Sequence, residues 1–170
     1  MNSKKNLVFL GMMGSGKSSI GFLVSKKLNL KFFDIDNMIE NEVGKKISSI
    51  FKDKGEIFFR QIEEEVTLKI LKTHNSVISL GGGGFINQKI RNEVLNNNSS
   101  IWLNWDVQTL LKRIKNSKKR PLVLNSTNKE IKNLIKERLK IYSKAKFKIN
   151  CNNLTMVEIV NKVTKIYELN

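Results

Sequence analysis

The sequence predicts an α/β fold in which helices cover both faces of a central parallel sheet of five strands. Short apolar runs typical of buried strands alternate along the chain with segments whose apolar residues recur at helical spacing. Strands that are separated by helices usually pair in parallel, with the helices packed on the faces of the sheet. Neither an internal repeat nor a linker divides the 170 residues, so we expect a single domain over residues 1–170.

Each element has a recognisable pattern in the sequence. We expect strands at 6–10, 31–35, 76–80, 100–104 and 147–151. We expect helices at 18–28, 36–43, 47–54, 56–72, 88–95, 107–115, 130–145 and 155–169. In the longest helix Phe59, Ile62, Val66 and Ile70 recur every three or four residues and share one face. Segment 116–128 is polar, basic and poor in core residues, so we expect it to be the most mobile.

The composition bounds the partners of the chain. With 31 basic and 15 acidic residues the net charge is +16, which favours anionic partners such as nucleic acid or small phosphorylated or carboxylated substrates. A third interpretation is a solvated surface, because Lys greatly outnumbers Arg and Asn is abundant. The sequence has no RNA-binding motif and no stripe of alternating aromatic and basic residues, so we expect no nucleic-acid partner.

The single cysteine and the N-terminus bear on location. Cys151 is the only cysteine, so an internal disulfide is impossible, which suits a reducing cytoplasm; we expect it to be a small buried residue. The apolar run at 7–10 follows Lys4 and Lys5 but breaks at Gly11, which is more typical of a buried strand than of a signal peptide. No apolar run approaches the roughly 18 residues of a membrane helix, so we expect no membrane partner and a cytoplasmic location.

Residues 11–18 read GMMGSGKS and match the phosphate-binding pattern G-x-x-x-x-G-K-[ST] between a predicted strand and a predicted helix. The glycines let the backbone curl so that successive N–H groups point inward, and the helix adds its positive end. Lys17 would reach the β- and γ-phosphates, and the Ser18 hydroxyl would ligate Mg²⁺. The sequence therefore predicts a three-layer P-loop NTPase fold that binds a nucleoside triphosphate.

The phosphate loop alone leaves several classes of protein open. GTPase switches usually carry the motif N-K-x-D, but Asn128 and Lys129 are followed by Glu130 and Ile131, so that motif fails. A helicase or motor needs more chain than 170 residues. Small-molecule kinases remain, and the loop does not identify their acceptor.

Two carboxylates stand near the end of the second predicted strand. The period of two along a strand would place Asp34 and Asp36 on the same side. Beside a phosphate loop they could divide the work, one on the magnesium shell and one on the acceptor hydroxyl. The alternative is an ordinary acidic helix start capped by Asp36.

An arginine and a glycine run are further candidates for the acceptor site. Arg60 and Glu63 are one helical turn apart and could pair, and an arginine fork suits a carboxylate ligand. Taken alone, this spacing is more typical of a surface ion pair. Four glycines at 81–84 follow a predicted strand; they would let a ligand approach the backbone, or form a flexible turn.

Taken together and in order, these pieces resemble the shikimate kinase family. The shared motifs are GxxGxGKS at 11–18, FxDxD at 32–36, GExxFRxxE at 55–63, SLGGG at 79–83, RPL at 120–122 and ERxxxY at 137–142. They extend over roughly the first 145 residues, and the combination is far more specific than any single motif. Two segments depart from the family pattern. Residues 152–154 are Asn-Asn-Leu where the family often has an arginine or proline near adenine, and Lys146 stands where an acidic residue is frequent.

The resemblance implies a role for each site residue on the nucleotide side. ATP would be bound by Gly14, Ser15, Gly16, Lys17, Ser18, Ser19, Arg113 and Arg120. Arg113 would flank adenine, and Arg120 would reach the transferring phosphate from a mobile lid at about 116–128. Mg²⁺ would be held by Ser18 and, through water, by Asp34. Ser79 would stand in the Walker B region, which lacks its usual aspartate.

The resemblance also implies the acceptor site, in the region of about 34–63 and beyond it. Shikimate would be bound by Asp36, Phe51, Phe59, Arg60, Glu63, Gly81, Gly82, Gly83 and Arg138. Asp36 would hold the 3-hydroxyl and take its proton, which makes it a catalytic residue together with Lys17 and Arg120. Arg60 and Arg138 would grip the carboxylate, with Glu63 holding both arginines in place.

The implied enzyme is an ATP-dependent kinase that makes shikimate 3-phosphate and ADP in aromatic amino-acid synthesis. We expect Mg²⁺ as its cofactor, ATP and shikimate as its small-molecule partners, and a monomer. The alternatives are another small-molecule kinase, such as a gluconate-type kinase, or a non-catalytic protein that binds nucleotide. The complete set of Asp36, Arg60 and Arg138 argues against the non-catalytic alternative.

Overall fold

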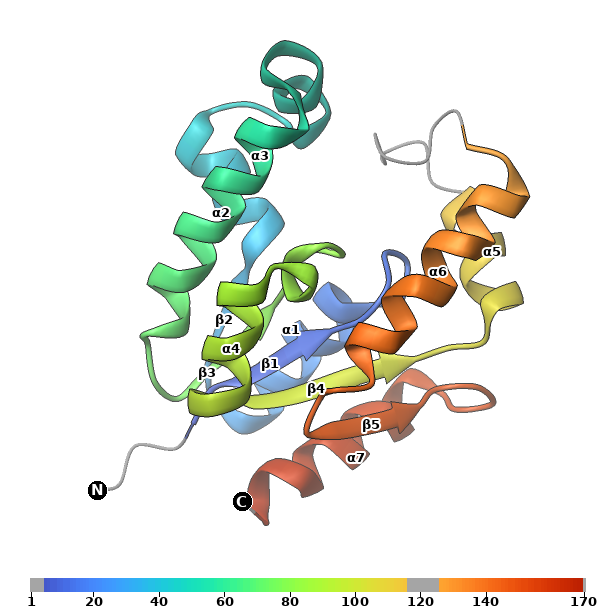
Figure 1. The fold of residues 1–170 in the computed structure, drawn as a ribbon. Coiled ribbons are helices and arrows are strands. Elements are labelled where there is room, and N and C mark those ends of the chain that lie inside the picture. The colour runs from blue at the N-terminus through green and yellow to red at the C-terminus, as the bar shows by residue number, and fades with distance from the viewer. Residues whose placement is uncertain (1–4, 116–125, 170) are drawn as a thin grey trace.

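The computed structural model describes residues 5–115 and 126–169, and its centre is a sheet of five parallel strands (Figure 1). The strands are β1 (Leu7–Leu10), β2 (Lys31–Asp34), β3 (Ser76–Ser79), β4 (Ser99–Asn104) and β5 (Phe147–Asn150). Their order across the sheet is β2-β3-β1-β4-β5, and every neighbouring pair is parallel. The predicted five-stranded parallel sheet is confirmed.

The helices follow the predicted alternation. They are α1 (Lys17–Leu28), α2 (Ile35–Val43), α3 (Ile47–Leu71), α4 (Gln88–Asn97), α5 (Val107–Lys115), α6 (Asn128–Tyr142) and α7 (Met156–Glu168), with a 3₁₀ turn at Gly84–Ile86. The two helices expected on either side of Gly55 form one element, α3, with a kink at that residue. Gly55 has φ 79° and ψ 175°, a conformation that side-chain-bearing residues rarely adopt. The kink separates the first turns of α3 from the long segment that carries Arg60.

The alternation of side chains along the buried strands divides the core between the two faces of the sheet. Leu7 and Phe9 of β1 point to the face covered by α1 and α7, where they meet Ile20 and Val163. Val8 and Leu10 point to the other face, where helices α2 to α6 complete a larger core. Burial on both faces explains why the central strand β1, Leu-Val-Phe-Leu, is a continuous apolar run. Cys151 lies in the smaller core and is fully buried, as predicted.

The strand order places three predicted motifs side by side. β3 lies between β1 and β2, with Ser79 opposite both Phe9 and Asp34. The amide of Leu80, just before the glycine run, donates to the Phe9 carbonyl at 3.1 Å. The connection that leaves β1 runs toward β2, whereas the connection that leaves the neighbouring β3 runs the other way to β4. Ligands in open parallel sheets bind beyond the carboxyl ends of two such strands. The phosphate loop, Asp34 and the glycine run therefore share one edge.

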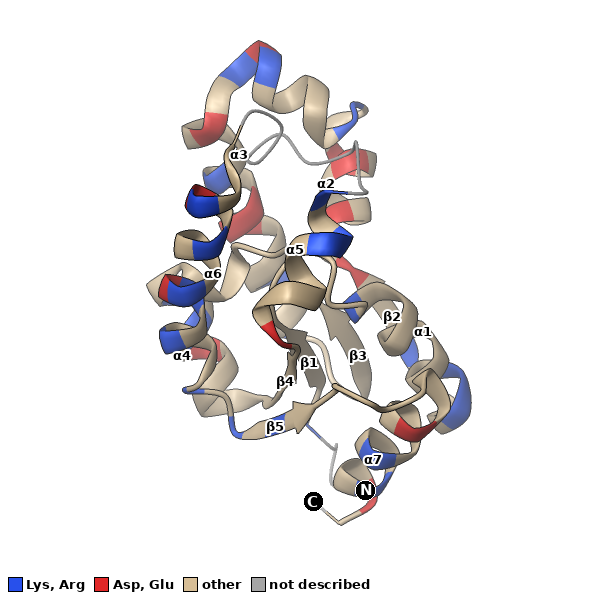
Figure 2. Ribbon diagram, turned by 90° about the vertical axis from the view of Figure 1, so that its right-hand side faces the viewer, with Lys and Arg blue, Asp and Glu red and all other residues tan. Residues whose placement is uncertain are grey.

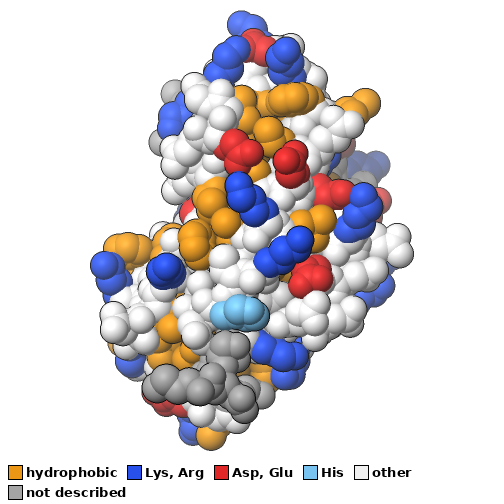
Figure 3. Space-filling model, turned by 90° about the vertical axis from the view of Figure 1, so that its left-hand side faces the viewer, with side chains coloured by type: hydrophobic (Ala, Val, Ile, Leu, Met, Phe, Trp, Pro, Cys, Tyr) orange, Lys and Arg blue, Asp and Glu red, His pale blue; other side chains and the backbone are white. Residues whose placement is uncertain are grey.

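Charged residues are spread over the surface rather than gathered at one place. Figure 2 shows basic positions along α6, α3 and α7, with acidic positions among them. On the face in Figure 3 acidic and basic side chains again lie close together. One ion pair of the structure joins Lys89 and Glu64 at 2.6 Å. This distribution is the one expected of a solvated basic surface. Within the described residues, no helix combines the length and the apolar composition needed to cross a membrane.

Candidate active site

The phosphate loop connects β1 to α1, and its backbone has the curl that the glycines were expected to allow. Gly11, Gly14 and Gly16 have φ of 141°, 79° and 85°. Gly16 is also the N-cap of α1 and makes no side-chain capping bond, so the helix end stays open to an anion. Within the described residues, the fully buried Ser15 hydroxyl has no hydrogen-bond partner. An orphaned donor and an open helix terminus both fit a bound phosphate.

Lys17 and the two serines after it lie at the mouth of this loop. The Lys17 ammonium donates to the carbonyls of Gly11 and Met12 at 3.0 and 3.1 Å, which folds its side chain back along the loop. Lys17 is 8% exposed, whereas Ser18 and Ser19 are exposed. The loop thus places a largely desolvated cation and two accessible hydroxyls at one edge of the sheet.

The predicted placement of Asp34 and Asp36 on one side of a strand is wrong. Strand β2 ends at Asp34 and helix α2 begins at Ile35, so the period of two stops before Asp36. The helix cap is Asp34, whose carboxylate accepts from the Asn37 amide at 3.1 Å, and not Asp36. Asp36 nevertheless faces the glycine run, because a methyl group at Gly81 would lie 2.7 Å from its Oδ1.

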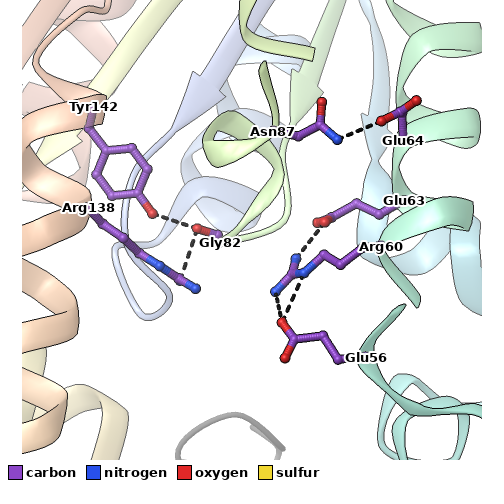
Figure 4. Close-up of polar contacts among 8 residues, drawn as sticks. All are labelled: Glu56, Arg60, Glu63, Glu64, Gly82, Asn87, Arg138 and Tyr142. Atoms are coloured by element: carbon purple, nitrogen blue, oxygen red, sulfur yellow. Dashed lines mark hydrogen bonds and ion pairs between the residues drawn. The ribbon is translucent and has the colours of Figure 1, made fainter. Parts of the chain in front are cut away.

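Arg60 is held by two carboxylates of its own helix (Figure 4). Its Nη1 donates to Glu63 at 2.5 Å, and its Nε and Nη2 donate to Glu56 at 3.2 and 3.1 Å. Its guanidinium also lies over the ring of Phe59, which packs against Phe51. The surface-pair interpretation is wrong, because Glu63 is only 2% exposed. The geometry is that of an arginine whose orientation is fixed before any ligand binds.

Burial and charge act against each other in this pair. Burial raises the pKa of Glu63. The positive charges of Arg60 and Arg138 lower it, but burial is the larger effect and the net shift is upward. Burial also pulls down the pKa of Arg60, but Glu63 and Glu56 outweigh it and the net shift is upward. Arg60 therefore stays charged.

A second arginine reaches the same space from α6. Arg138 Nη1 donates to the Gly82 carbonyl at 3.2 Å, and the Tyr142 hydroxyl donates to the same oxygen at 2.5 Å. Figure 4 shows the guanidinium groups of Arg138 and Arg60 extending from opposite helices toward the space beside Gly82. A methyl group at Gly83 would lie 2.9 Å from the Arg60 guanidinium carbon, so the glycine run packs directly against that arginine.

The remaining predicted residues divide into those near the loop and those outside the structure. Arg113 Nη1 donates to the Gly14 carbonyl at 3.3 Å, on the flank of the phosphate loop. Arg120 and most of the expected lid lie outside the described residues. Trp105, whose indole N–H donates to the Ser15 carbonyl at 2.9 Å, was not predicted as a site residue. Its position at the end of β4 became informative only once β4 was known to neighbour β1.

The residues present fit a magnesium ion of the kind that phosphate loops hold. Among the described residues, no three His, Cys, Asp or Glu side chains gather into an all-protein metal site. Mg²⁺ usually takes one or two protein oxygens and completes its shell with water and substrate phosphates. The Ser18 hydroxyl and the Asp34 carboxylate are oxygen donors of that type at the phosphate-loop edge.

A site built on a phosphate loop between a parallel strand and a helix is that of a P-loop phosphotransferase. The family model for shikimate kinase matches residues 13–168. The chain therefore belongs to the shikimate kinase family and is an ATP-dependent kinase, as the sequence motifs indicated.

Individual relatives agree with this assignment over nearly the whole chain. The shikimate kinase of Persephonella marina is 40% identical over 159 residues, which cover 94% of this chain and 96% of that protein. The structure of the Aquifex aeolicus shikimate kinase is 37% identical and covers 96% of both chains, with a TM-score of 0.86. The Acinetobacter baumannii shikimate kinase in complex with shikimate has a TM-score of 0.91 at 27% identity, covering 98% of this chain and 94% of that chain.

Proposed function

We propose that this chain transfers the γ-phosphoryl group of ATP to the 3-hydroxyl of shikimate, giving shikimate 3-phosphate and ADP. The observation that supports this acceptor best is the approach of Arg60 and Arg138, from α3 and α6, to one space beside the glycine run. Two guanidinium groups suit a planar carboxylate. Asp36, which faces Gly81, supplies a group for a hydroxyl of the same small molecule.

On the acceptor side each residue has a separate task. Asp36 holds the 3-hydroxyl and takes its proton as the oxygen attacks the γ-phosphorus. Arg60, fixed by Glu56 and Glu63, binds one side of the carboxylate, and Arg138 binds the other. Phe51 and Phe59 wall the pocket, while the backbone of residues 81–83 lines it. Positioning of this kind can supply much of the rate enhancement of a phosphoryl transfer.

On the nucleotide side the phosphate loop and its helix bind the triphosphate. Lys17 offsets the charge that builds up on the β- and γ-phosphates, and Arg113 flanks the adenine. We assign Arg120 to the transferring phosphoryl group on the strength of the RPL motif alone. Ser18 and, through water, Asp34 would hold Mg²⁺, which neutralises the phosphate oxygens when it is bound. As the new P–O bond forms, the bond to the β-phosphate oxygen breaks and ADP leaves.

A substrate panel tests this function. ADP release would be measured with shikimate, quinate, gluconate and glycerol, and the product would be identified by ³¹P NMR. Shikimate should give the highest kcat/KM and a single 3-phosphate ester. Faster turnover of gluconate would assign the chain to the other kinase class, and ATP binding without turnover of any acceptor would support a non-catalytic role. We also infer a monomer in the cytoplasm, and light scattering during gel filtration tests the monomer.

A further inference from the structure

Trp105, directly after β4, contacts both the phosphate loop and the arginine assigned to adenine. Its indole N–H donates to the Ser15 carbonyl at 2.9 Å. The guanidinium carbon of Arg113 lies 3.8 Å from the centre of the Trp105 ring, which is a close cation–π contact. Arg113 in turn donates to the Gly14 carbonyl at 3.3 Å. One half-buried side chain therefore connects the two parts of the nucleotide site.

The bond to Ser15 has a geometric consequence for phosphate binding. Because a trans peptide is planar, the Ser15 carbonyl and the Gly16 N–H point in opposite directions. Holding the carbonyl on the Trp105 indole therefore turns the Gly16 N–H away from Trp105. Gly16 has φ 85° and offers no side chain to fix this peptide by packing. An external anchor for the Ser15–Gly16 peptide preorganises the N–H groups that meet the phosphates.

The backbone beside Trp105 is itself fixed by the loop that departs from the family pattern. The Asp106 amide, which shares a peptide with Trp105, donates to the Asn152 side chain at 3.0 Å. Asp106 also caps the start of α5 through the Thr109 amide and hydroxyl, at 2.8 and 2.6 Å. Helix α5 ends against the phosphate loop, since a methyl group at Gly14 would lie 3.4 Å from the Arg113 Cβ. Asn152 thus supports Trp105 and α5 together.

We propose that Trp105 is a positioning residue of the nucleotide site. Its ring holds the Arg113 guanidinium in place, and its N–H fixes the Ser15–Gly16 peptide. This inference rests on the proposed function only in assigning adenine to Arg113. The predicted effect is on the nucleotide alone, because Trp105 makes no contact with Arg60 or Arg138 among the interactions described above.

The test measures ADP affinity by calorimetry, which needs no acceptor. Trp105→Phe keeps a ring under Arg113 and loses the N–H, so we expect the Kd to rise by about threefold to tenfold. Trp105→Leu loses both contacts and should raise the Kd for ADP by a further factor of about three. The same replacements should leave the KM for shikimate within about twofold, whereas a general loosening of the fold would raise both constants. Phe22→Leu is the matched control, because it removes a ring that contacts Lys26 and Phe32 and, among the interactions described, no residue of the phosphate loop.

A double-mutant cycle separates the two contacts of Trp105. If the ring acts through Arg113, Trp105→Leu should weaken ADP binding more than Trp105→Phe does in the parent. The two replacements should give the same ADP Kd in an Arg113→Ala background. An ADP Kd within about twofold of the parent in a folded Trp105→Leu protein would overturn the proposal. The proposal would also be overturned if the ratio of the ADP Kd in Trp105→Leu to that in Trp105→Phe were the same with Arg113 and with Arg113→Ala. Should the Leu variant fail to fold, the Phe variant decides, because an unchanged Kd there contradicts the role of the N–H. The outcomes measured as ADP affinity do not depend on whether shikimate is the acceptor, and only the comparison of KM values does.

Discussion

The Tyr142 hydroxyl donates a hydrogen bond to the Gly82 carbonyl, with 2.5 Å between the two oxygens. Tyr142 lies one helical turn after Arg138 on α6, and Arg138 donates to the same carbonyl. This shared acceptor fixes the peptide between Gly82 and Gly83, and with it the direction of the Gly83 N–H. The arginine that would bind the acceptor carboxylate and the glycine run that would line the pocket are therefore held together.

Removal of the Tyr142 hydroxyl should weaken the binding of the acceptor and leave the binding of the nucleotide unchanged. In Tyr142→Phe we expect the KM for shikimate to rise about threefold to tenfold, because the partly buried Gly82 carbonyl loses one of its two partners, while the KM for ATP stays unchanged. Burial raises the pKa of Tyr142 to about 12, so the phenol remains protonated and keeps donating at neutral and moderately alkaline pH. The ratio of variant to parent KM should therefore be the same at about pH 7 and pH 9. A ratio that falls toward one on raising the pH would show that the phenol had already ionised.

Two glycines of the run make a matched pair of substitutions. A methyl group at Gly81 would lie 2.6 Å from Glu63 Oε1 and 2.7 Å from Asp36 Oδ1, so Gly81→Ala must displace both carboxylates. At Gly84 the nearest atoms would be 3.6 and 3.7 Å away, which is ordinary contact. We expect Gly81→Ala to lower kcat/KM for shikimate by at least about 100-fold and Gly84→Ala to stay within about threefold. Similar losses in the two variants would remove the special role of Gly81.

Lys17 should be needed for turnover and not for folding. Lys17→Ala removes the cation of the phosphate loop and should lower kcat by on the order of 100- to 1,000-fold, as other losses of transition-state charge stabilisation do. Its hydrogen bonds to Gly11 and Met12 stay within the loop, so the circular dichroism spectrum should match that of the parent. Turnover within about threefold of the parent would contradict the kinase mechanism.

A magnesium titration should distinguish the roles proposed for Asp34 and Asp36. Asp34→Asn keeps the cap of α2, because Asn is as good an N-cap as Asp, but it removes the charge that we propose acts on Mg²⁺ through water. It should raise the Mg²⁺ concentration needed for half-maximal activity. Asp36→Asn should instead lower kcat strongly at an unchanged magnesium requirement, since we propose that Asp36 takes the acceptor proton. The reverse pattern would exchange the two roles.

The sequence was most informative where the structure depends on neighbouring residues. Within the described residues, the sequence pattern predicted all five strands and every α-helix, although the kinked α3 was expected as two helices on either side of Gly55. The 3₁₀ turn at Gly84–Ile86 was not predicted. The phosphate loop was predictable because its function requires glycines and Lys17 at fixed spacing. The length of β2 was overestimated by one residue, since the capping of α2 by Asp34 competes with continuation of the strand.

Interactions between distant segments could not be predicted from local pattern. The spacing of Arg60 and Glu63 indicates a pair, but only the packing of α3 against the sheet buries Glu63. The Trp105 contact with Ser15 spans 90 residues and depends on β4 lying beside β1, which no local pattern specifies. Arg138 became a candidate for the acceptor site only through the family motif that contains it, and its hydrogen bond to Gly82 joins residues 56 positions apart.

The central claim is that Arg60 and Arg138 together select an acceptor with a carboxylate. The most direct measurement compares kcat/KM for shikimate and its carboxamide in the parent and in Arg60→Lys. Loss of a charge-assisted contact costs on the order of 1.5–3 kcal/mol, so the parent should prefer the acid by at least about tenfold. Lysine lacks the planar fork, so Arg60→Lys should lose most of that preference, while the control Arg91→Lys, outside the site, should keep it. Equal phosphorylation of the acid and the amide by the parent would contradict the account.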